Sequence, residues 1–324
     1  MALLLTEDQI MLADSAREFL DAEAPPSRFR AMRDAGKVYD ADLWSRLVEL
    51  GWPSIPFAED AGGLGMGLAE AAIVIEAMGY RLVAAPMVSA VGASVLDPSF
   101  GAQTGRVLGI AWREHARDRD PARVATVADG GRITGRKLGV LDGTTAEAFV
   151  VSARVGDEIG LFRVKASDAT VIPLQRIDHR DAADVVFDGA PGERLDGGLD
   201  LLRRGVEAMD VANAAEWLGG MCGAFDRTKA YLHERRQFGV PIGSFQALQH
   251  RAVDLFIQIE LCRSAVMQAA REPTTAWVEL ARIKCSETYL AVAKEAVQMH
   301  GGIGMTDECD IGFFTKRAMV AAFG

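Results

Sequence analysis

The residues with the clearest chemical potential lie in one run, Glu234-Arg-Arg-Gln-Phe-Gly-Val-Pro-Ile-Gly-Ser-Phe-Gln-Ala-Leu-Gln-His250. Two arginines end one helical stretch, and a new helix is predicted to begin near Ser244. Guanidinium groups and the free N–H groups of a helix N-terminus both bind phosphate oxygens, so the run is typical of a diphosphate site. Phe238 is suited to packing against a planar ring, and Gln246 and Gln249 to bonding a ribose or a phosphate. An ordinary helical hairpin with surface arginines would show the same pattern.

Two glycine-rich runs could also either bind a ligand or form ordinary turns. Gln298-Met-His-Gly-Gly-Ile-Gly304 follows a predicted helix, and its glycines would let a ligand approach the backbone closely. Taken alone, it favours a helix C-cap followed by a linker. The run Gly62–Gly67 has no strand before it and no Lys-Ser/Thr after it, so it is not a phosphate-binding P-loop and is predicted to be a structural turn.

The elements that must position these residues change character along the chain. Residues 1–105 are predicted to be helical, with a capping box from Thr6 and Gln9 at the first helix. Residues 106–197 hold short β-rich runs separated by glycine or acidic turns, which indicates a small antiparallel β-domain. Residues 198–324 are predicted to be helical again, with one long helix loosened at its double glycine, Gly219-Gly220. The predicted fold class is therefore α+β, with three domains.

The composition of the chain disfavours some classes of function. The 324 residues carry a formal net charge of -10, which disfavours nucleic acid as a partner but leaves room for a phosphorylated ligand. The four cysteines and the histidines show no metal-ligand spacing, so no metal site is predicted and the thiols are expected to be reduced.

No signal peptide is predicted. The N-terminus has acids at Glu7 and Asp8 where a signal peptide would be basic. The apolar stretch Ala71–Leu96 is interrupted by charged residues and Pro86, which predicts a buried helix pair and no membrane span. A cytoplasmic protein is the expectation.

Together, the arginine run and the later glycine run resemble the two FAD-binding segments of acyl-CoA dehydrogenases. The resemblance extends to Leu50-Gly-Trp-Pro-Ser-Ile-Pro56, to Arg132-Ile-Thr-Gly-Arg-Lys137 and to the helical, β, helical order, so it covers nearly the whole chain. It implies that this chain grips the ADP half of an FAD whose flavin ring lies mostly in a neighbouring subunit. The residues that the match assigns to this grip are Arg235, Gln237, Phe238, Ile242, Phe245, Gln246, Gln298, Gly301 and Gly302.

The family reaction needs a carboxylate that removes the α-proton of an acyl-CoA while the flavin takes a hydride. Many members place this glutamate well beyond the segment that matches Lys316-Arg-Ala318, and the given sequence stops at Gly324. Other members place it at the position of Met209, which cannot act as a base. Asp210 and Glu207 lie nearby, but a one-residue offset turns a helical side chain by about 100°. Both are therefore weak candidates for the base.

The sequence also departs from the family pattern in the segment that lines the flavin ring. The family's Thr-Glu-Pro…Gly-Ser-Asp type of segment, which lines the ring, corresponds here to the densely charged Ala111–Arg123, expected to be a solvated loop. An intact ADP clamp without a base or ring contacts predicts one subunit of a heteromer, of the α2β2 kind. The resemblance implies an acyl-CoA substrate, a catalytic partner subunit and an electron-transfer flavoprotein as acceptor, and some bacterial pairs of this kind act on steroid side chains.

Two alternatives stay open. One is a self-sufficient homo-oligomeric dehydrogenase that uses Asp210 or Glu207. The other is a relative with a different activity, such as a flavin monooxygenase-like protein or a nucleic-acid-binding protein, and the net charge disfavours the latter.

Overall fold

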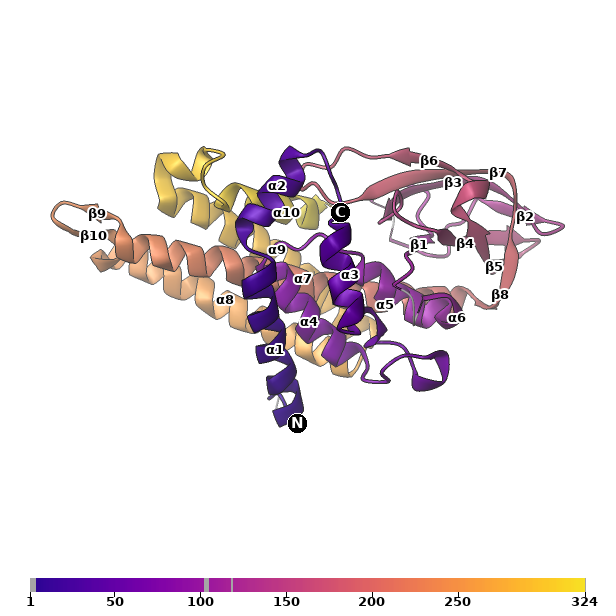
Figure 1. The fold of residues 1–324 in the computed structure, drawn as a ribbon, viewed down its shortest axis with the longest axis horizontal. Coiled ribbons are helices and arrows are strands. Elements are labelled where there is room, and N and C mark those ends of the chain that lie inside the picture. Colours follow the sequence, from indigo (N-terminus) through magenta and orange to yellow (C-terminus); the bar gives the residue numbers. More distant parts are fainter. Residues whose placement is uncertain (1–3, 102–104, 118, 324) are drawn as a thin grey trace. The chain divides into compact units, whose positions relative to one another are not determined.

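A computed structural model describes residues 4–101, 105–117 and 119–323 (Figure 1). Its elements run in the predicted order, with helices first, a sheet next and helices last, which confirms the predicted fold class. No helix in these described ranges is both long and apolar enough to span a membrane.

The N-terminal helices begin and end where the sequence signals predict. Thr6 caps α1 and its side chain accepts from the backbone of Gln9, while the Gln9 side chain accepts from the backbone of Thr6. Asp40 caps α3, and the left-handed Gly51 (φ 75°) follows it. The helical elements here are α1 (Glu7–Glu23), α2 (Pro26–Asp34), α3 (Ala41–Glu49), η1 (Trp52–Ser54), η2 (Glu59–Ala61), α4 (Leu68–Tyr80), α5 (Met87–Leu96) and α6 (Pro98–Gly101).

The glycine-rich run before α4 is a structural turn, as predicted. A Cβ atom at Gly63 would lie 2.2 Å from the carbonyl oxygen of Phe57, so the turn folds back on the chain that precedes it. Gly62, Gly65 and Gly67 all adopt positive φ angles, which other residues rarely do. The run Ala71–Leu96 forms α4 and α5.

The middle of the chain forms a mostly antiparallel sheet. Its strands are β1 (Leu108–Ala111), β2 (Val127–Asp129), β3 (Arg132–Leu141), β4 (Ala148–Val155), β5 (Glu158–Lys165), β6 (Thr170–Pro173), β7 (Ala182–Pro191) and β8 (Glu193–Gly198), with the short helix η3 (Ala166–Asp168) between β5 and β6. The strand order is β6-β7-β3-β2-β4-β5-β8, and β1 pairs with β4. Only the β1–β4 and β2–β4 pairs are parallel among the described strands. Phe149 and Phe187 pack edge to face in its core, with ring centroids 6.1 Å apart.

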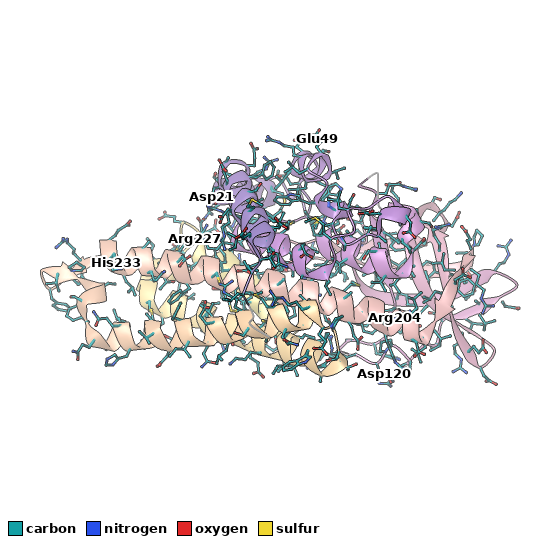
Figure 2. The ribbon with its side chains drawn as sticks, turned by 90° about the horizontal axis from the view of Figure 1, so that it is seen from below. Asp21, Glu49, Asp120, Arg204, Arg227 and His233 are labelled. Carbon is teal, nitrogen blue, oxygen red and sulfur yellow. The ribbon has the colours of Figure 1, made fainter. Side chains whose placement is uncertain are left out.

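The C-terminal part consists of long helices joined by tight turns. The elements are α7 (Leu199–Glu234), β9 (Arg236–Gln237), β10 (Val240–Pro241), η4 (Ile242–Ser244), α8 (Gln246–Arg271), α9 (Thr275–His300), η5 (Gly301–Met305) and α10 (Ile311–Phe323). The helices α7, α8 and α9 lie side by side (Figures 1 and 2).

The expectation that the double glycine loosens α7 is wrong, because α7 is continuous through it. A Cβ atom at Gly219 would lie 1.9 Å from the carbonyl oxygen of Glu76 on α4. A Cβ atom at Gly220 would lie 2.4 Å from the hydroxyl oxygen of Tyr289 on α9. The two glycines therefore allow neighbouring helices to pack closely against α7.

The chain divides into two compact units that do not follow its linear order. One unit combines the residues up to Ala31, Ala72–Val83 and the chain from Asp210 onward, and the other combines Met32–Ala71 with Ala84–Met209. The three predicted domains, 1–105, 106–197 and 198–324, therefore stay a prediction. The arginine run and the later glycine run both belong to the first unit.

Candidate functional site

The arginine run forms a β-hairpin with a two-residue turn at the end of α7. Strands β9 and β10 pair through Gln237 and Val240, and the N–H of Ile242 donates to the carbonyl oxygen of Arg235 over 2.8 Å. The tip residues Phe238 (φ 52°) and Gly239 (φ 81°) are both left-handed, as in a type I′ turn. Phenylalanine is an unusual residue for this conformation.

The side chains of this hairpin face solvent. The Phe238 side chain is 92% exposed and meets the ring of Phe245 edge to face, with centroids 6.1 Å apart. Arg235 and Arg236 are also exposed, and no carboxylate in the described part of the chain pairs with either of them. Two cations and an aromatic ring are thus presented outward, which suits an anionic ligand with a flat group.

The glutamines of this region differ in how they are engaged. Gln249, which the sequence suggested for a ribose or a phosphate, donates from Nε2 to the carbonyl oxygen of Gly243 over 2.9 Å and so holds the turn before α8. Gln237 donates to the carbonyl oxygen of Arg236 over 2.8 Å. Gln246 is exposed in the first turn of α8, beside the exposed Phe245 and the half-buried Ile242.

Two of the three glycines after α9 are required by the local structure, for different reasons. Gly301 caps the helix with φ 66° and ψ -144°, a conformation that only glycine adopts readily. A Cβ atom at Gly304 would lie 2.9 Å from the carbonyl oxygen of Val297, so close packing against α9 requires glycine there. Gly302 has an ordinary φ angle, and a Cβ atom on it would meet nothing within 4 Å. The described chain itself therefore gives no reason for glycine at position 302.

The hairpin and the glycine turn lie at the same end of the helical bundle (Figure 1). The rings of Tyr231, in the last turn of α7, and His300, at the end of α9, stack with centroids 4.4 Å apart and an interplanar angle of 20°. Figure 2 shows Arg227 and His233 along α7, with His233 nearer the hairpin. Gln298 is exposed in the last turn of α9. The structure thus brings together the two segments that the sequence singled out.

The carboxylates near Met209 were the candidates for a catalytic base. Met209 is buried, and a Cβ atom at Gly92 on α5 would lie 2.7 Å from its sulfur atom, so its side chain packs against that helix. Asp210 is buried one position further along α7, and Glu207 is partly exposed. The position where some family members carry the base is therefore filled by a packed apolar side chain.

The expectation of a solvated loop at Ala111–Arg123 is wrong for its first half. Trp112 is buried, and the Glu114 side chain forms an ion pair with Lys137 on β3, with 2.7 Å between Oε1 and Nζ. Glu114 also accepts from the backbone N–H groups of Ala125 and Thr126. The segment is thereby anchored to the sheet.

Lys137 is fully buried, and its ammonium group also donates to the Ser152 hydroxyl over 2.9 Å. Burial lowers the pKa of Lys137 to about 8, although Glu114 opposes this shift. Burial raises the pKa of Glu114, but the hydrogen bond and the charge of Lys137 outweigh it, so the pKa of Glu114 lies below its ordinary value. The sequence offered one signal of this pair, a lysine within a β-rich run.

Comparison with known proteins places the chain in a family. The model of the acyl-CoA dehydrogenase N-terminal domain matches residues 6–101, and that of the C-terminal domain matches residues 196–324. The acyl-CoA dehydrogenase IpdE2 of Mycolicibacterium smegmatis is 31% identical over 97% of this chain and 93% of its own length.

Two solved structures share the fold. The ChsE4-ChsE5 complex from Mycobacterium tuberculosis contains a chain that is 26% identical, with a TM-score of 0.91 over 100% of this chain and 94% of that one. A variant of the Tcur3481-Tcur3483 steroid ACAD contains a chain that is 28% identical, with a TM-score of 0.88 over 98% of this chain and 93% of that one. The chain therefore belongs to the acyl-CoA dehydrogenase family, whose members are FAD-dependent oxidoreductases.

Proposed function

We propose that this chain is one subunit of an FAD-dependent acyl-CoA dehydrogenase and contributes the ADP-side clamp to an FAD held mainly by a catalytic partner subunit. The observation that carries the proposal is Gly302, where the described chain leaves open space beside the backbone and requires no glycine. The open space at Gly302, in the turn that follows α9, leaves room for a ligand to approach the backbone closely.

The charges and the geometry fit the diphosphate of FAD. Arg235 and Arg236 are exposed cations without a carboxylate partner in the described residues, and they lie at the same end of the bundle as Gly301 and Gly302. Guanidinium groups bind phosphate oxygens through charge-assisted hydrogen bonds. Phe238 offers a flat apolar surface for the adenine ring. When bound, FAD supplies the redox chemistry, and these residues hold its ADP half.

The catalytic half of the reaction is assigned to the partner. Met209 is packed against α5 and cannot remove a proton. The segment Ala111–Arg123 carries no threonine or serine for the flavin ring, and its Glu114 is committed to Lys137. The clamp of this chain is also far from its own Asp210, since Arg235 follows Asp210 by 25 positions and a helix of that length spans about 38 Å at about 1.5 Å per residue. An acyl-CoA therefore reacts in a pocket whose base this chain does not provide.

A surface for such a partner is present on α8 and α9. One face of each helix carries large apolar side chains that are 39–54% exposed, at the three- and four-residue spacing of a single helix face. These residues are Val253, Phe256, Ile257 and Leu261 on α8 and Trp277, Leu280 and Ile283 on α9. Exposed apolar faces of this kind mark sites of protein–protein contact.

The related structures extend the proposal to the assembly and its substrate. Two of them, ChsE4-ChsE5 and Tcur3481-Tcur3483, are named as pairs of proteins, and the second is named as a steroid ACAD. By this likeness we infer an α2β2 heteromer that acts on the CoA thioester of a bulky, steroid-derived acyl chain. An electron-transfer flavoprotein is the inferred electron acceptor.

The test compares FAD retention in the enzyme assembled from this chain and its partner. Arg235→Ala removes a charge-assisted bond worth about 1.5–3 kcal/mol, so FAD affinity should fall by about ten- to a hundredfold. Gly302→Ala should also weaken FAD binding, while the unfolding of this chain alone stays unchanged. The matched control is Gly312→Ala, at another glycine with open space around it but outside the clamp. Unchanged flavin content in both clamp variants after extensive dialysis would refute the proposal.

A further inference from the structure

A ring stack joins the two helices from which the halves of the clamp emerge. Tyr231 precedes Arg235 by one helical turn, and its carbonyl oxygen accepts from the N–H of Arg235 over 2.8 Å. His300 directly precedes Gly301 at the end of α9. Each ring of the stack thus belongs to the last turn of the helix from which one clamp segment emerges.

The His300 ring is held in place by the helix that carries it. His300 is buried, and its Nδ1 lies 2.8 Å from the carbonyl oxygen of Ala296. A carbonyl oxygen only accepts, so Nδ1 carries the proton of this bond. Burial lowers the pKa of His300, which keeps the ring neutral near pH 7. The ring therefore keeps one orientation and one charge state.

Each clamp segment is also fixed to its own helix. A Cβ atom at Gly243 would lie 2.9 Å from the carbonyl oxygen of Leu232, so the base of the hairpin is folded tightly against α7. Gly304 is packed in the same way against Val297 of α9. With both segments tied to their helices, the distance between the ends of α7 and α9 determines the distance between the arginines and the glycine turn.

We propose that the Tyr231–His300 stack positions the two clamp segments relative to each other, so that the arginines and the glycine turn meet the same ADP diphosphate. Tyr231 and His300 are positioning residues in this assignment, and neither has to touch the ligand. The inference rests on the proposed function. Its physical basis is that a site held in its bound geometry before the ligand arrives loses less entropy on binding.

The experiment uses the assembled enzyme stripped of flavin and titrated with FAD and, separately, with FMN, which lacks the adenylate half. Tyr231→Leu removes the stack and should weaken FAD binding by about two- to tenfold, the range for an aromatic pair, while FMN affinity is unchanged. Tyr231→Phe keeps the ring and should restore the FAD affinity. A role in general stability would change both affinities together and would not alter their ratio.

A second variant replaces the other residue of the stack. His300→Leu should reduce the ratio of FAD to FMN affinity to the same extent as Tyr231→Leu, and the double variant should be no worse than either single variant. This variant also keeps the inference testable if Tyr231→Leu fails to assemble. An unchanged ratio in both variants, or additive losses in the double variant, would overturn the inference.

Failure of this inference can be told apart from failure of the proposed function. If Arg235→Ala lowers the FAD to FMN ratio and the stack variants do not, the clamp stands and the positioning role is wrong. If Arg235→Ala also leaves the ratio unchanged, the ADP clamp itself is wrong.

Discussion

A buried lysine is costly unless a partner compensates its charge, and Lys137 has such a partner in Glu114. The ion pair is reinforced by the Ser152 hydroxyl and by two backbone N–H groups that donate to Glu114. Replacing such a pair by apolar groups is often neutral, whereas removing one member leaves the other charge buried and unpaired. The pair therefore fixes the course of the segment Ala111–Arg123 more than it adds net stability.

At this scale we predict that Glu114→Gln lowers the free energy of unfolding by about 3–5 kcal/mol near neutral pH. The deficit should shrink as the pH rises through about 8, where Lys137 of the unaltered chain also loses its proton. Urea denaturation at several pH values measures both effects. Adding Lys137→Met to Glu114→Gln should recover most of the loss, and a double variant as unstable as the single one would contradict this account.

At the scale of elements, the crossing of α4 and α7 depends on glycine. Gly79 on α4 and Gly219 on α7 each lie against the other helix. A Cβ atom at Gly79 would lie 2.1 Å from the main-chain carbonyl oxygen of Glu216, and one at Gly219 would lie 1.9 Å from that of Glu76. Backbone atoms cannot move aside as a flexible side chain can. The two helices are therefore held at a distance that no larger residue permits.

We predict that Gly219→Ala destabilises the chain by about 1–3 kcal/mol, the usual range for an overpacked core. The intrinsic preference of helices for alanine acts in the opposite direction by up to about 1 kcal/mol, so a net loss would isolate the steric term. Thermal unfolding measures the change, with Gly312→Ala as a helical glycine that has open space around it. A melting temperature for Gly219→Ala at or above that of the unaltered chain would show that the crossing adjusts.

At this scale, the sequence predicted features that depend on interactions between residues close together in the chain. The cap of Thr6 and Gln9 is a local signal, and α1 begins directly after Thr6. Strands β2 and β8 carry weak local signals, because β2 has three residues and β8 is largely polar and exposed.

The features of the site that the sequence could not predict also depend on contacts between residues far apart in the chain. The two clamp segments were found from their local residue types, but nothing local pairs Tyr231 with His300. Gly219 looked like a helix breaker because its reason, the carbonyl of Glu76, lies far away along the chain. The anchoring of Glu114 by Lys137 was hidden for the same reason.

At the scale of the whole molecule, the proposed function separates an ADP clamp, which this chain provides, from a reaction centre in its partner. The hairpin and the glycine turn lie at the same end of the helical bundle, and large apolar side chains on α8 and α9 are exposed. The buried Met209 occupies the position of a possible base. Under the proposed function, another chain completes the site.

We predict that the purified chain alone does not dehydrogenate any acyl-CoA, since an absent general base costs about 10²–10⁴-fold in rate and the flavin-ring contacts are missing too. In the assembled enzyme, Asp210→Asn should leave the rate within about a few-fold of the unaltered enzyme, because the partner brings the base. Steady-state assays with a set of acyl-CoA thioesters measure both. If the pure chain binds one FAD per subunit and turns over, and Asp210→Asn abolishes that turnover, the self-sufficient homo-oligomer replaces the heteromer.

The open space at Gly302 has a genetic consequence. A side chain there would touch nothing in the described chain, so the altered protein would fold, escape cellular quality control and accumulate normally. Under the proposed function, it would still offer its α8 and α9 faces to the partner and would take up catalytic subunits in assemblies that hold FAD poorly. An allele of this type would act as a dominant negative, whereas an allele that disrupts the α4–α7 crossing would remove the protein and be recessive.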